Sequence, residues 1–126
     1  MFPNFIVFFR KRKQWFSVYL HDTSPNTFSR KGGGSWGYWL ARWKNPRKGF
    51  FGEIHLVKSR VRVDSVSHEL DHLRCEWIFQ NGIQLTTRNE EWYCRFGDEL
   101  IRNFFREYKK YDERSKTITQ SKRSTK

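Results

Sequence analysis

The sequence predicts an α+β domain in which a small N-terminal β-sheet is followed by two helices. The chain has 126 residues, a length typical of one domain with a single hydrophobic core. Its first half consists of short segments rich in aromatic and β-branched residues, separated by basic, glycine-rich or proline-containing turns. From residue 64 onward, apolar residues instead recur every three or four positions, which is typical of amphipathic helices. Strands that precede helices in this way favour an α+β fold.

Four strands are expected in the first half, at residues 5–10, 15–21, 36–43 and 50–58. The basic run at residues 10–13 supplies the turn between the first two strands, and residues 44–49 supply the turn before the fourth. Residues 30–35 are expected to form a flexible glycine-rich connection. They do not match a phosphate-binding loop, because no Gly-Lys-Ser/Thr sequence follows them and no helix opens after them.

The first helix is expected to begin at Asp64, a suitable N-cap residue, and to continue to about Phe79 before the Asn81-Gly82 pair ends it. The second helix is expected to open at Glu90 with an apolar stripe of Cys94, Gly97, Ile101, Phe104 and Tyr108. Apolar residues nearly vanish after residue 111. We therefore expect a domain at residues 1–111 and a disordered basic tail at residues 112–126.

Positive charge is concentrated in the first part of the chain. The formal net charge is +12, and the span up to Gly52 holds ten Lys or Arg residues and one acid, Asp22. Such an excess attracts nucleic acid or another polyanion, but it equally fits a solvated surface that repels its own copies. Aromatic residues beside these cations, such as Trp36 and Trp39, could stack on bases, although packing in the core of a small domain is their expected role.

The two cysteines, Cys75 and Cys94, lie among apolar residues of the expected helices. Buried, reduced thiols are therefore expected rather than a disulfide. The longest apolar run, residues 5–9, is only as long as a strand, and neither a membrane-spanning segment nor a cleavable signal peptide is recognisable. These features favour a cytoplasmic protein with no membrane partner.

The segment SVSHELDHLRC, residues 65–75, contains the pattern H-E-x-x-H at His68, Glu69 and His72. Residues four apart on a helix lie on one face, so the two imidazoles can bind one metal ion. Two neutral nitrogens suit Zn²⁺, and the neighbouring Glu69 carboxylate can take a proton from a polarised water. The pattern therefore predicts a zinc site held by His68 and His72, with Glu69 as the catalytic base.

A catalytic zinc site typically takes a third protein ligand. No histidine follows His72, which excludes a pattern with a distal histidine ligand. Glu90 and Glu91 open the second helix, 18 and 19 residues after His72, and either carboxylate could close the site if that helix packs against the motif helix.

These segments resemble a known family. "VSHELDHL" followed by "NEEWYCRFGDELI" is similar to the gluzincin pattern of small metallopeptidase-like proteins encoded by phages and mobile elements, which include relatives of the peptidases that cleave phage-type repressors. The resemblance implies a zincin-like pair of helices, Zn²⁺ as cofactor and Glu90 as the third ligand, ahead of Glu91. The chain departs from the pattern at Cys94, where gluzincins often carry an Asp or Asn that supports a motif histidine. Tyr93 and His55 are the nearest candidates to steady an oxyanion, with a structural role expected for each.

We therefore expect a zinc-dependent metallopeptidase-like protein that hydrolyses peptide bonds of a protein substrate, in the cytoplasm of the host cell if a phage encodes it. The alternative is a basic module that binds nucleic acid or an acidic protein through its basic surface and tail, with a structural or inactive metal site. Phosphodiester cleavage is a weaker third interpretation, because that chemistry usually uses more carboxylates around its metal ions.

Overall fold

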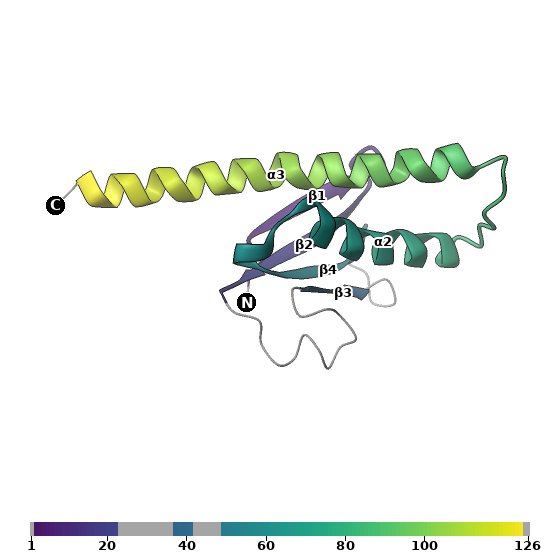
Figure 1. Cartoon of the computed structure of the whole chain (residues 1–126), viewed down its shortest axis with the longest axis horizontal. Helices are drawn as coiled ribbons and strands as arrows, with labels where there is room; N and C mark the ends of the chain where they lie inside the picture. The colour runs from purple at the N-terminus through teal and green to yellow at the C-terminus, as the bar shows by residue number, and fades with distance from the viewer. Residues whose placement is uncertain (1, 23–36, 42–48, 125–126) are drawn as a thin grey trace.

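The computed structural model describes residues 2–22, 37–41 and 49–124 of the chain (Figure 1). Its elements are β1 (Phe5–Phe9), β2 (Gln14–His21), β3 (Gly37–Ala41), β4 (Phe50–Val57), a 3₁₀ turn (Lys58–Arg60), α2 (Val63–Gln80) and α3 (Glu90–Ser124). The strands precede the two long helices, so the predicted α+β class is confirmed. The connections expected at residues 30–35 and 44–48, and the ends of the strand expected at residues 36–43, lie outside the described residues.

The four strands form one mixed sheet in the order β1-β2-β4-β3. β1 and β2 form an antiparallel hairpin, in which Phe9 pairs with Gln14 across the basic turn. β2 and β4 run parallel, whereas β3 runs antiparallel to β4 and pairs Gly37 with Leu56. β3 is therefore an edge strand, and β4, which leads into α2, lies inside the sheet.

Both helices cover the same face of the sheet (Figure 1). Side chains alternate between the two faces of a strand, and the residues that face the helices are the apolar ones. The buried core joins Phe5, Val7, Phe9, Phe16, Val18, Ile54 and Leu56 from the strands to Val66, Leu70, Leu73 and Trp77 from α2 and to Phe96, Leu100 and Phe104 from α3. On α2, Val66, Leu70, Leu73 and Trp77, which recur at helical spacing in the sequence, are all buried, whereas Phe79 near the end of the helix is exposed.

The buried face of α3 differs from the predicted stripe. Phe96, Leu100 and Phe104 form its buried centre, whereas Cys94 is exposed. Cys75 on α2 is exposed as well, and neither cysteine forms a disulfide. The expectation of buried thiols was wrong, because each cysteine lies just outside the arc of its helix that contacts the core.

α3 is longer than the sequence predicted. It does not end near residue 111 but continues as a regular helix to Ser124, so residues 112–124 are helical rather than disordered. No glycine or proline interrupts this segment, and polar contacts one turn apart support it: Lys116 pairs with Asp112 at 3.1 Å, and the Thr117 hydroxyl donates to the Glu113 carbonyl at 2.9 Å. The lack of apolar residues indicated a lack of packing, not a lack of helix. No helix in the described residues is long and apolar enough to cross a membrane.

Tyr111 is the last described residue of α3 that packs against the core. We therefore expect the fold to need α3 only as far as Tyr111. The hydroxyl of Tyr111 accepts a hydrogen bond from the Asn4 amide at 3.0 Å, and its ring lies 5.6 Å from the Phe5 ring. We expect deletion of residues 113–126 to change the free energy of unfolding by no more than about 0.5 kcal/mol, while Tyr111→Ala lowers it by about 1–3 kcal/mol. Urea denaturation followed by circular dichroism measures both. A deletion as costly as Tyr111→Ala would contradict this account.

Candidate metal centre

His68, Glu69 and His72 lie together in the first half of α2. One ligand atom from each of the three side chains lies within 4.8 Å of those of the other two. The rings of His68 and His72, one helical turn apart, lie edge to face with their centroids 5.0 Å apart. Within the described part of the chain this is the one group of three or more metal-ligating side chains at such distances. The structure therefore brings together the three residues of the H-E-x-x-H pattern.

The three side chains differ sharply in exposure. Both histidines are exposed, whereas Glu69 is 3% exposed. Glu69 points from the helix toward the edge strand β3, where Gly37 faces it. A β-carbon at Gly37 would lie 3.6 Å from Cγ of Glu69, but only 2.7 Å from the carbonyl oxygen of His55 and 2.9 Å from Cδ2 of Leu56. The absence of a side chain at Gly37 thus lets β3 pair closely with β4 beneath the carboxylate.

In the described part of the chain, the buried Glu69 carboxylate lacks a hydrogen bond that would offset its loss of hydration. Its Oε1 atom has no hydrogen-bond partner among the described residues. Desolvation raises the pKa of Glu69, an effect that the charge of neighbouring His68 partly opposes. A buried carboxylate oxygen without a partner costs free energy, and such atoms are found where a ligand, water or ion completes the site. A raised pKa also brings a carboxylate closer to the range that suits a general base near neutral pH.

The donor set fits a zinc ion. Imidazole nitrogens are ligands that Zn²⁺ takes in proteins, whereas Ca²⁺ and Mg²⁺ prefer oxygen alone, and the two histidines supply two of the three protein ligands that a catalytic zinc site typically takes. The exposure of His68 and His72 leaves a route for an ion from solvent. The unpartnered Oε1 of Glu69 is available to an ion or to a water beside it. His68 and His72 would hold the ion, with Glu69 directly below them.

The structure does not bring Glu90 or Glu91 into this group. Neither belongs to the three-residue group, and both are exposed in the first turn of α3. The start of α3 lies beside the last turns of α2, where the Trp77 and Trp92 rings are 5.7 Å apart (Figure 1). His72 lies five residues before Trp77, which is about 7.5 Å back along the helix axis.

The side of α2 that faces α3 is also not the side that carries the histidines. Nη1 of Arg74 donates to the Tyr93 carbonyl at 3.0 Å, which shows where α3 packs. His72 precedes Arg74 by two residues, and its side chain therefore points to roughly the opposite side of the helix, at about 100° per residue. The distance along the axis and the direction around it both separate Glu90 and Glu91 from the histidine pair.

Tyr93 and His55 also lie away from the histidine pair. The Tyr93 ring packs under the guanidinium of Arg74 at 4.0 Å, on the side of α2 that faces α3, and burial is the main cause of its raised pKa. His55 alternates with the core residues of β4 and therefore lies on the sheet face that the helices do not cover. Neither residue is placed to steady an oxyanion at Glu69.

A hydrogen-bonded chain of three side chains was not predicted from the sequence. Nδ1 of His55 lies 2.9 Å from Nε2 of His21, and Nε2 of His55 lies 3.0 Å from a carboxylate oxygen of Glu53. The His55 ring stacks on Tyr19 with centroids 4.6 Å apart. Desolvation lowers the pKa of His21, against the opposing charge of Asp22. In the sequence, these residues show only as polar side chains that alternate with apolar ones in two strands. The sequence did not predict that these two strands pair in parallel.

No known protein family, curated protein sequence or solved structure matches this chain. The gluzincin resemblance therefore depends on the two sequence segments that carry it, and the interpretation of the site depends on its geometry.

The free energy of unfolding should reveal the cost of burying Glu69. Because the pKa of Glu69 is raised in the folded protein, folding favours the protonated form, and stability should decrease as pH rises from the ordinary value of 4.5 through the folded pKa. In metal-free protein, Glu69→Leu should remove this loss and raise stability by about 1–3 kcal/mol at neutral pH, with a smaller gain in acid.

Denaturation in the presence of a chelator, at acid and at neutral pH, checks this prediction. Glu76→Leu, on the same helix, is the control for replacing a carboxylate by an apolar side chain. If Glu69→Leu is less stable than the wild type at neutral pH, the carboxylate has a stabilising partner and this description of the site is wrong.

Proposed function

We propose that this protein is a zinc-dependent peptide hydrolase in which His68 and His72 hold the metal ion and Glu69 is the general base. The observation that carries the proposal is the position of Glu69, a buried carboxylate without a partner for Oε1 among the described residues, directly beside two exposed imidazoles. A residue that only supported the fold would be expected to have its hydrogen bonds satisfied. Under this proposal α2 is the motif helix of a zincin-like domain, as the resemblance to small phage-encoded metallopeptidase-like proteins implies.

Each motif residue has a distinct role in this reaction. A bound Zn²⁺ would polarise the scissile carbonyl group and lower the pKa of a coordinated water. His68 and His72 hold their imidazoles one helical turn apart toward solvent, which fixes the reaction at the surface of α2. Glu69 accepts a proton from the attacking water and returns it to the departing amine nitrogen. Its raised pKa favours the first of these transfers, because a weaker acid binds its proton more readily than an ordinary carboxyl group does.

The edge strand beside Glu69 supports a peptide as the substrate. β3 is last in the strand order, and no other described strand pairs with its outer edge. An extended peptide can add to such an edge through main-chain hydrogen bonds. Gly37 on β3 faces Glu69, so a peptide paired with β3 would pass close to the proposed base.

The sharpest test of the proposed base is Glu69→Gln. Glutamine keeps the size of the side chain but cannot accept a proton, and general-base catalysis contributes about 10²–10⁴-fold. We expect this variant to retain zinc while the hydrolysis of an unfolded protein such as casein falls by at least about 100-fold. The assay is run with and without a chelator. Glu76→Gln removes a carboxylate from another position of the same helix and should keep full activity.

Metal binding is tested separately by titrating zinc into metal-free protein in a calorimeter. His68→Ala and His72→Ala should each abolish the binding signal, because a single imidazole cannot hold the ion at this surface. Unchanged binding in both variants would move the metal elsewhere. Glu90→Gln and Glu91→Gln test the third ligand that the sequence suggested; from their placement we expect both to bind zinc like the wild type. A loss of affinity confined to Glu90→Gln would show that the start of α3 closes onto the site.

A further inference from the structure

The turn between β1 and β2 has an unusual backbone. Arg10, Lys11 and Arg12 have φ angles of 56°, 58° and 65°, so three consecutive residues with side chains adopt the left-handed conformation. This conformation costs about 1–2 kcal/mol for each residue other than glycine, and Asn-Gly pairs are the usual solution in a hairpin. The chain instead places four consecutive cations at residues 10–13, which we call the basic turn. Strain of this kind points to a function for the side chains it carries.

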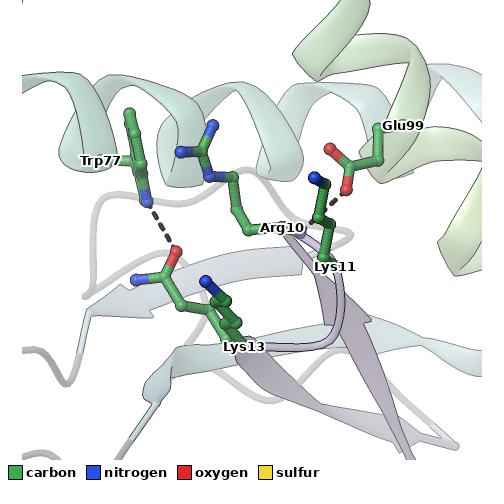
Figure 2. Close-up of a pocket in the computed structure, with 6 residues that line it drawn as sticks. Arg10, Lys11, Lys13, Trp77 and Glu99 are labelled. Carbon is green, nitrogen blue, oxygen red and sulfur yellow. Dashed lines mark hydrogen bonds between the residues drawn. The ribbon is translucent and has the colours of Figure 1, made fainter.

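Two cations of the basic turn are held over aromatic rings. The Arg10 guanidinium lies 4.6 Å from the centre of the Trp77 ring, and the Arg12 guanidinium lies 4.4 Å from the centre of the Phe8 ring (Figure 2 shows Arg10 and Trp77). The Arg10 amide donates to a carboxylate oxygen of Glu99 at 2.8 Å. The two Arg10 contacts anchor the turn to α2 and α3, yet in the described residues no acidic side chain forms an ion pair with a cation of the turn.

A cavity opens beside the turn. It measures about 480 Å³ and is lined by Arg10, Lys11, Lys13, Gln14, Trp77 and Glu99. The side chains of Arg10, Lys11 and Lys13 extend from the turn toward the helices around this cavity (Figure 2). The Glu99 carboxylate already accepts a hydrogen bond from the Arg10 amide, and the Gln14 side-chain oxygen accepts one from the Trp77 indole at 2.8 Å. Three cations face one opening whose described lining holds a single carboxylate, so the cavity favours an anion.

We propose that the basic turn binds the phosphate backbone of a nucleic acid. A phosphodiester supplies what the three cations lack, namely charged oxygens that accept hydrogen bonds from several directions. A polyanion also suits a protein whose formal net charge is +12 and whose turn repeats its positive charge at each of four positions. An acidic protein segment would have to place several carboxylates at matching positions, whereas a nucleic acid carries regularly spaced phosphates in any sequence. The contact is therefore with the backbone and is independent of sequence.

The test removes charge while it relieves the strain. In the double variant Lys11→Asn and Lys13→Gln, which removes two of the three cations that line the cavity, the asparagine adopts the left-handed conformation more readily than lysine, so the thermal midpoint should stay the same or rise. Binding of a fluorescein-labelled DNA duplex, measured by anisotropy at several salt concentrations, should weaken at least about tenfold. The slope of log K against log salt should become shallower by about 0.9 for each phosphate that the turn no longer neutralises.

The matched control is the double variant Arg102→Ala and Lys109→Ala, which removes the same charge from exposed positions of α3. It should bind DNA within about twofold of the wild type if binding is local to the turn rather than a consequence of net charge. An equal loss in the control, a wild type that does not bind, or equal binding of poly-glutamate would each overturn the proposal. So would a lower thermal midpoint in the turn variant, because the cations would then support the fold. Glu69→Gln should bind DNA normally, which separates this proposal from the proposed hydrolase.

Discussion

The burial of one carboxylate beneath two exposed histidines is the constraint on which the candidate site depends. Glu69 can lie there because Gly37 leaves room for the edge strand to pair closely with β4 below it. The core residues Leu70 and Leu73 anchor the next turn of α2 against the sheet and thereby fix the direction of the helix. Since that direction is fixed by packing, His68 and His72 must project to solvent beside Glu69. The site is thus a consequence of how α2 rests on the sheet.

The proposed metal centre and the basic turn share a physical signature. In each, the chain keeps a group at a cost that the described structure does not offset: a desolvated carboxylate oxygen at Glu69 and a left-handed backbone at residues 10–12. Folding alone would favour an apolar residue in the first place and Asn-Gly in the second. Natural proteins retain such costs mainly where function requires them. The two features lie at different places in the fold, so each can be tested without disturbing the other.

The local spacing of apolar residues predicted the secondary structure but not the contacts between distant elements. The α+β class, the four strands and the placement of His68 and His72 on one face of a helix all follow from spacings of two to four residues. The position of Glu90 does not, because it depends on which side of α2 meets α3. The same is true of the parallel pairing that joins His21 to His55. The exposure of Cys94 was missed because apolar neighbours in the sequence do not show on which side of the helix a residue lies. The helix beyond residue 111 was missed because a low apolar content indicates little packing but does not exclude a helix.

Zinc X-ray absorption spectroscopy of the protein loaded with one equivalent of Zn²⁺ tests the central claim most directly. We expect a first shell of nitrogen and oxygen at about 2.0–2.1 Å, with the multiple-scattering pattern of two imidazoles, and loss of that pattern in the double variant His68→Ala and His72→Ala. Glu69→Gln should keep both imidazoles. A sulfur contribution at about 2.3 Å, or a spectrum with two imidazoles that survives the double histidine substitution, would contradict the proposed site and place the metal elsewhere in the chain.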